Sequence, residues 1–157
     1  MRRPSRYGGA MPPGRDRRLV LWLLVCWAVV VAYLTLRPKV APDSTFDAVR
    51  AAIAWLDGRG VPVTYNQVEA GANVVMFAPF GVLAGLLARR RWPVVLAGAA
   101  ISAGIETTQA LFLPSRVATV QDVAMNTLGA LVGVAVLVVV HHRRTRRPAP
   151  TTAGRLP

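Results

Sequence analysis

Acidic residues and cysteine are scarce in this chain. Its 157 residues include 7 Asp or Glu against 19 Lys or Arg, and the single cysteine is Cys26. One cysteine can form neither a disulfide within the chain nor a cysteine metal cluster. The two histidines, His141 and His142, are neighbours beside a block of arginines. Without a carboxylate or thiol to complete a ligand set they indicate a membrane flank, so we predict no metal and no cofactor.

The excess of positive charge has a particular placement. The formal net charge is +12, which in a soluble protein would favour nucleic-acid binding. Here the basic residues form blocks where long apolar runs stop, and they do not alternate with aromatic residues. This placement is typical of orientation signals in membrane proteins, and the 54% hydrophobic content agrees with it. We therefore predict contact with membrane lipids and not with nucleic acid.

Long apolar runs predict an all-α membrane domain over residues 19–140. A helix of eighteen residues spans about 27 Å, close to the thickness of the hydrocarbon layer. The first run lacks a following small-x-small cleavage site, which favours a retained helix over a signal peptide. The predicted transmembrane helices cover residues 19–36, 72–88, 93–113 and 123–140, and we predict disordered basic tails at residues 1–18 and 141–157.

The connection formed by residues 37–71 contains a further helical signal. Ser44 and Asp47 match a capping pattern, and apolar residues then recur at helical spacing until Gly58. These apolar residues are Phe46, Val49, Ile53 and Leu56. The pattern predicts a short helix that either lies on the membrane surface with its apolar face down or packs on the bundle.

The distribution of Lys and Arg predicts the orientation. Both tails and the Arg89–Arg91 connection fall on one side of a four-helix topology and together hold fourteen basic residues, against five on the other side. Basic residues concentrate on the cytoplasmic side of membrane proteins. We therefore expect a multi-pass membrane protein with both termini in the cytoplasm.

Polar side chains recur on single faces of the last two predicted transmembrane helices. Ser102, Glu106 and Gln109 share one helical face, as do Asp122 and Asn126 on the next helix. These helices are joined by about nine residues, so they should pack antiparallel with the two faces together. We expect a polar pocket that is open to the outer surface, and its predicted lining is Asn73, Glu106, Gln109, Arg116, Asp122 and Asn126.

Small residues predict where the helices approach one another. Gly81 and Gly85 form one G-x-x-x-G pattern, and Gly129 and Gly133 form another. Glycines at this spacing allow close contact between membrane helices. Pro79 lies inside the second predicted transmembrane helix and predicts a kink there.

Glu106 is the one carboxylate inside a predicted apolar run. An unpaired charge in the hydrocarbon costs about 2.5–3.5 kcal/mol, so Glu106 must be paired, protonated or in contact with water. It either belongs to an interhelical hydrogen-bond network or helps to bind a polar headgroup or proton-linked ligand. For Asp122 a local role is also open, because Thr119-x-x-Asp122 matches a capping box.

Three motifs resemble the VanZ-like family of small bacterial membrane proteins. Asn73-Val-Val-Met-Phe77-Ala-Pro79-Phe-Gly81 is similar to the N-x-x-x-F-x-P-x-G helix of that family, and Glu106-Thr-Thr-Gln109 to its E-x-x-Q. Arg116, followed by the run from Asp122 through Asn126 and Gly129 to Gly133, resembles the R and D-x-x-x-N-x-x-G-x-x-x-G ending. The resemblance covers residues 73–133.

The resemblance implies a location in the bacterial plasma membrane and a function at the cell envelope. The family takes its name from a protein associated with resistance to teicoplanin, which acts on a cell-wall precursor at the outer face. We therefore expect binding of a lipid-linked wall precursor or a lipid headgroup. Two alternatives remain open: an intramembrane enzyme with Glu106 or Asp122 as general base, and a small transporter that would have to oligomerise. Because the pocket lacks a His or Cys, we favour binding over catalysis.

Overall fold

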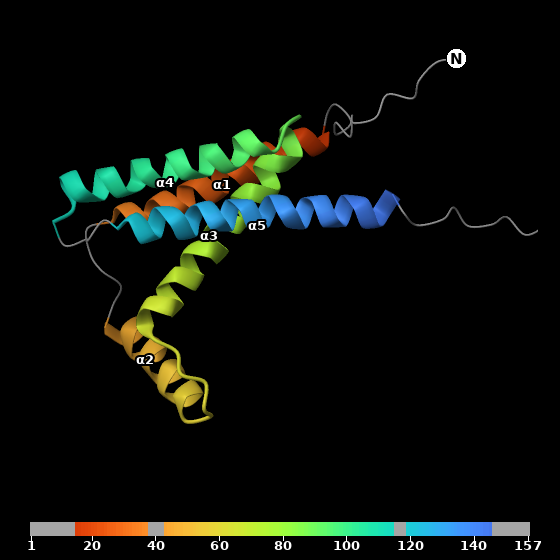
Figure 1. Ribbon diagram of the computed structural model, residues 1–157. Helices are drawn as coiled ribbons and strands as arrows, with labels where there is room; N and C mark the ends of the chain where they lie inside the picture. The colour runs from red at the N-terminus through yellow and green to blue at the C-terminus, as the bar shows by residue number, and fades with distance from the viewer. Residues whose placement is uncertain (1–14, 38–42, 115–118, 146–157) are drawn as a thin grey trace, which may run out of the picture.

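The chain folds into helices. The computed structural model describes residues 15–37, 43–114 and 119–145, and these residues contain five helices and no strand (Figure 1). The helices are α1 (Arg15–Leu36), α2 (Asp43–Asp57), α3 (Tyr65–Leu87), α4 (Trp92–Phe112) and α5 (Val120–Thr145). The predicted all-α class is confirmed.

Four of these helices are long and apolar enough to cross a membrane. They are α1, α3, α4 and α5, which confirms the predicted number of transmembrane helices. Their bounds differ from the prediction mainly in length. α3 begins at Tyr65, within the predicted connection, while α1 begins at Arg15 and α5 continues to Thr145, within the predicted tails. The rest of both tails lies outside the described residues.

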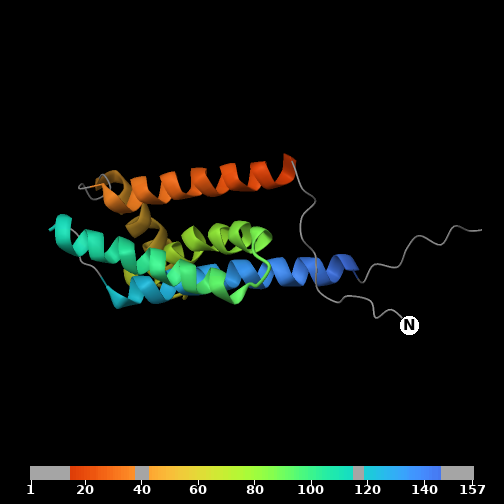
Figure 2. The same ribbon diagram turned by 90° about the horizontal axis from the view of Figure 1, so that it is seen from above.

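The transmembrane helices share one long direction, with α3 crossing the others at an angle (Figures 1 and 2). The start of α1, the connection between α3 and α4 and the end of α5 all lie at the same end of the bundle. We call this end, which includes Arg89–Arg91, the basic end. The opposite end, where α4 ends and α5 begins, is the distal end.

Glycines bring α3 and α5 into direct backbone contact. A Cβ atom on Gly81 would overlap the carbonyl oxygen of Ala130, and one on Gly133 would overlap that of Ala78. A Cβ on Gly129 would meet the backbone of Val74 in the same way. Both predicted glycine motifs thus lie at one helix pair, where close approach increases van der Waals contact in the absence of a hydrophobic driving force. Pro79 lies inside α3, which continues without a break to Leu87.

α1 is attached to the bundle through aromatic residues. The indole nitrogen of Trp27 donates a hydrogen bond to the carbonyl oxygen of Met76 at 2.8 Å. The Trp27 ring also contacts Phe77 edge-on, with centroids 5.4 Å apart, and Phe80 at 5.0 Å. Phe80 belongs to the buried core with Val94, Ala130 and Val134, so this cluster joins α1, α3, α4 and α5.

α2 stands beside the first part of α3, at the distal end (Figure 1). Among the described helices it contacts α3 alone. Its last residue, Asp57, immediately precedes Gly58, where the sequence predicted the helix to stop. The predicted Ser44 cap is not described at the side-chain level. After the turn, α3 starts with a capping box in which Thr64 and Gln67 each bind the backbone of the other.

Candidate functional site

Asn73 and Asp122 join α3 to α5 near the distal end. The Asn73 amide nitrogen donates a hydrogen bond to Oδ1 of Asp122 at 2.5 Å. Both side chains are half-buried. A hydrogen bond to a charged group is stronger than one between neutral groups, roughly 1.5–3 kcal/mol. The two residues, 49 positions apart, were both predicted to line the polar pocket, and the structure brings them into contact.

The start of α5 is capped by Thr119, the residue that precedes it, and by Glu106 of α4. The Asp122 backbone nitrogen donates to Oγ1 of Thr119 at 3.1 Å, which is one half of the predicted capping box. In a complete box the Asp122 side chain would accept from the Thr119 backbone nitrogen. Instead, the Thr119 backbone nitrogen donates to Oε2 of Glu106 on α4 at 2.9 Å. Glu106 therefore supplies the second half of the box, and the Asp122 carboxylate is left to bind Asn73.

This arrangement places the Glu106 carboxylate at the start of α5. The N-terminus of a helix exposes unsatisfied N–H groups and a partial positive charge, both of which favour a carboxylate. Glu106 is half-buried and lies one turn from Ser102 on α4. The contact gives the Glu106 carboxylate a polar partner in this apolar helix and fits the predicted interhelical network.

Asn126 and Ser102 make the most buried polar contact between α4 and α5. The exposed fractions of the two residues are 3% and 0%. The Asn126 amide nitrogen donates to the Ser102 hydroxyl oxygen at 2.8 Å. The Oδ1 atom of Asn126 is also buried, yet it has no hydrogen-bond partner among the residues that the structure describes. A buried acceptor without a hydrogen bond lowers the stability of the fold by about 1–3 kcal/mol, so its presence calls for an explanation.

Gln109 faces a different neighbour from the one expected. Its amide nitrogen donates to the backbone carbonyl oxygen of Thr35 on α1 at 2.8 Å. Thr35 is buried, and its hydroxyl donates to the Val31 carbonyl within α1. Thr35 was not among the predicted residues. Its sequence signal was a hydroxyl near the end of an otherwise apolar run, a weak signal because Thr often bonds its own helix.

Three further residues belong to the distal end or were predicted to lie there. Arg116, expected to roof the site, lies outside the described residues. Asn66 and Gln121, which are both exposed, exchange hydrogen bonds of 3.1 and 3.5 Å between α3 and α5. We call the set Asn73, Ser102, Glu106, Thr119, Asp122 and Asn126 the polar cluster. It draws on α3, α4, α5 and the residue preceding α5.

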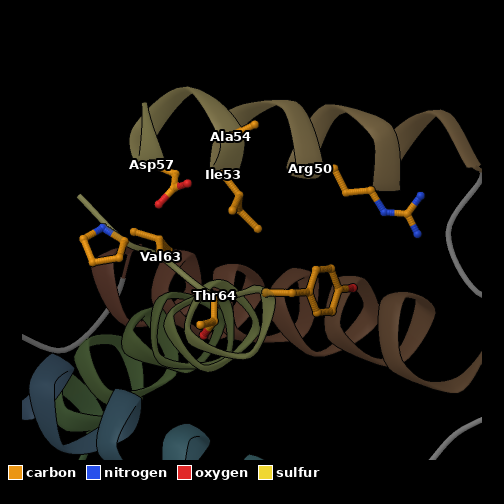
Figure 3. Close-up of a pocket in the computed structure, with 8 residues that line it drawn as sticks. Arg50, Ile53, Ala54, Asp57, Val63 and Thr64 are labelled. Carbon is orange, nitrogen blue, oxygen red and sulfur yellow. The ribbon is translucent and has the colours of Figure 1, made fainter. Parts of the chain in front are cut away.

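The polar cluster provides hydrogen-bonding groups and two carboxylates. Within the described ranges, no three His, Cys, Asp or Glu side chains come close enough to hold a metal ion. A large cavity lies outside the cluster, between α2 and the segment that leads into α3 (Figure 3).

Comparison with known proteins gives one finding of similarity. A family model described as VanZ/LLP1 matches residues 20–141, from the first turns of α1 almost to the end of α5. No curated protein and no solved structure matches the chain.

Proposed function

The chain belongs to the VanZ/LLP1 family, as the resemblance of its motifs predicted, and from this membership we propose a function at the cell envelope. In this proposal the polar cluster binds the polar headgroup of a lipid-linked envelope molecule, such as a wall precursor. The distal end faces outward from the bacterial plasma membrane. Binding there would connect the protein to glycopeptide resistance of the teicoplanin type.

The unpartnered Oδ1 atom of Asn126 is the observation that carries the proposal. It lies inside a cluster whose other polar groups bind one another across three helices. A network that served stability alone would satisfy its most buried acceptor. A ligand hydroxyl, amide or amine would supply the missing donor.

The carboxylates of the cluster support binding over general-base catalysis. Glu106 accepts a hydrogen bond from the Thr119 backbone, and Asp122 accepts one from Asn73. A general base has to lie within reach of the proton that it removes. Carboxylates held by donors of the protein itself are better suited to fixing the shape of a binding site.

Cysteine labelling would test the orientation. In a Cys26→Ser background we expect Val61→Cys, in the turn between α2 and α3, to react with a membrane-impermeant maleimide added to intact cells. Arg90→Cys, at the basic end, should react only after the membrane is opened. The reason is that Arg89–Arg91 and the basic ends of α1 and α5 favour the cytoplasm. The reverse labelling pattern would contradict the proposed orientation.

Glu106→Gln separates charge from helix capping. Glutamine keeps an oxygen that can accept from the Thr119 backbone, so we expect the variant to fold and accumulate normally. We propose that the charge of Glu106 also contributes to ligand binding, so the lipid-linked wall precursor that co-purifies with the protein should fall at least about tenfold. Mass spectrometry of the lipid extract measures this quantity, and growth in teicoplanin gives a cellular readout.

Thr108→Val is the matched control for this variant. Thr108 is two residues away on α4, and its hydroxyl binds the carbonyl oxygen of Gly104 in the same helix. We expect this change to leave both accumulation and bound lipid unaltered. If Glu106→Gln fails to accumulate while Thr108→Val is normal, Glu106 serves stability and the functional assignment of its charge is wrong.

A further inference from the structure

Arg37, which immediately follows α1, is a charged side chain that its described neighbours satisfy only in part. It forms no salt bridge within the ranges that the structure describes. The residue is half-buried, and its Nε atom is buried without a hydrogen-bond partner among the described residues. A buried donor on a charged group is costly when it stays unsatisfied, because it loses contact with water and gains no acceptor. An anion from outside the chain would supply that acceptor.

Arg59 provides a comparison on the same chain. Each of these two arginines follows an aromatic residue by four positions and lies over its ring. The guanidinium carbon is 5.5 Å from the ring centroid for Arg37 over Tyr33, and 3.4 Å for Arg59 over Trp55. Arg59, however, is exposed, and its Nη1 atom donates to the Trp55 carbonyl oxygen at 3.5 Å. The unsatisfied donor is therefore particular to Arg37 in this pair and does not follow from the ring contact.

The depth of Arg37 matches the phosphate layer of a membrane. The candidate membrane span of the first helix ends at Leu36, so Arg37 is the first residue beyond it. Tyr33, whose ring lies under the guanidinium, belongs to a residue type that concentrates at the boundary between lipid and water. Lipid phosphates occupy this depth in both leaflets. The match therefore holds whichever side of the membrane the distal end faces.

An exposed stripe of α1 leads to Arg37. Cys26, Val30, Tyr33 and Arg37 follow one another at i, i+4, i+7 and i+11, the spacing of a single helical face. The first three of these residues are exposed on the helix. A lipid with its phosphate at Arg37 would lay its upper acyl chain along this stripe, whereas a soluble anion would leave the stripe uncovered. The stripe therefore favours a lipid as the source of the phosphate.

We propose that Arg37 binds the phosphate group of a membrane phospholipid whose upper acyl chain lies on Tyr33, Val30 and Cys26. A guanidinium presents its N–H donors in a planar fork that fits phosphate oxygens, and Nε–H is one of these donors. A positive charge also stabilises the C-terminus of a helix, but that role needs no lipid. The site is separate from the polar cluster and does not depend on the function proposed for it.

The test uses the full chain in maltoside micelles, which contain no phosphate, and two photoreactive lipids. One is phosphatidylglycerol with a photoreactive group near the top of an acyl chain, and the other is a glycolipid with the same chain and no phosphate. After irradiation, mass spectrometry maps the labelled peptides. The phosphatidylglycerol should label residues 29–36 at least about fivefold more than the glycolipid does. Arg37→Gln should lower its labelling there to the level of the glycolipid.

Arg59→Gln is the matched control, because it removes the same charge from an arginine that also lies over an aromatic ring. It should leave the labelling of residues 29–36 as in wild type. Excess inorganic phosphate should not reduce this labelling, since it has no acyl chain to lie on the stripe; a loss of labelling would assign a soluble anion to Arg37 and overturn the lipid.

Two further results would overturn the proposal. The first is equal labelling of residues 29–36 by the two lipids in wild-type protein, a comparison that does not require any variant to fold. The second is wild-type labelling of this segment by phosphatidylglycerol in folded Arg37→Gln protein. Either result would leave Arg37 with its role at the C-terminus of α1 alone.

Discussion

Gly133→Ala is expected to destabilise the folded protein by about 3 kcal/mol, although it adds a single methyl group. In the structure that methyl group would overlap the carbonyl oxygen of Ala78 and lie 2.9 Å from the backbone nitrogen of Val82. Both neighbours are backbone atoms of α3, so no side chain can turn away. The two helices would have to separate along the contact that holds them together.

Gly104→Ala provides the control for this prediction. Gly104 lies inside α4, and a Cβ atom there would meet nothing within 4 Å. Alanine favours a helix over glycine by about 1 kcal/mol, so this change should leave stability unaltered or raise it. The comparison therefore isolates packing from helix propensity, because the same substitution is made inside two helices.

Denaturation of the purified protein in micelles, followed by tryptophan fluorescence, measures both variants. We expect a lower midpoint for Gly133→Ala and an unchanged or higher midpoint for Gly104→Ala. Gly81→Ala should resemble Gly133→Ala, because its Cβ would overlap the Ala130 carbonyl on the opposite side of the same contact. A wild-type midpoint for both Gly81→Ala and Gly133→Ala would show that α3 and α5 are not closely packed in the protein.

The transmembrane helices could be predicted from the sequence because hydropathy and length alone define them. The start of α3 could not be predicted in this way, since residues 65–71 are mostly polar or small and extend the helix beyond its apolar part. The signal was present in Thr64 and Gln67, which form a capping box. Apolar content identifies the part of a helix that lies in lipid, whereas caps identify where the helix itself begins.

The polar cluster could be predicted only in part from the sequence, for a different reason. Helical spacing correctly placed Ser102 and Asn126 on facing sides of α4 and α5, and they form a hydrogen bond. The same spacing grouped Gln109 with Ser102, but Gln109 binds α1. Periodicity identifies which residues share a face, but it does not identify the helix that covers each part of that face. The exchange of capping partners between Glu106 and Asp122 likewise depends on tertiary contact.

Replacing both Ser102 and Asn126 by apolar residues is expected to preserve stability while removing function. Leucine is close to asparagine in shape, so Asn126→Leu combined with Ser102→Ala keeps most of the packing. The change loses one hydrogen bond, worth about 1 kcal/mol, and also removes the unpartnered Oδ1 acceptor, whose burial costs about 1–3 kcal/mol. The denaturation midpoint should therefore be equal to that of wild type or higher.

The amount of wall precursor that co-purifies with this double variant should fall, although its stability is kept or raised. If the Oδ1 atom of Asn126 accepts a hydrogen bond from the ligand, its loss should reduce bound precursor at least about tenfold, in protein that is no less stable. Thr127→Val is the control, because the Thr127 hydroxyl binds the Val123 carbonyl within its own helix, α5. That variant should match wild type in both measurements.

The denaturation midpoint and the amount of bound precursor together distinguish a binding site from an interhelical clamp, by which we mean a hydrogen bond that serves only to hold α4 and α5 together. A clamp contributes stability, so its removal should lower the midpoint, and any loss of bound lipid would follow the loss of folded protein. A binding site retains an unfavourable buried acceptor because the ligand pairs with it, so its removal raises stability at the expense of function. A lower midpoint with unchanged precursor per folded molecule would assign Asn126 and Ser102 to the clamp and refute the binding function proposed for the cluster.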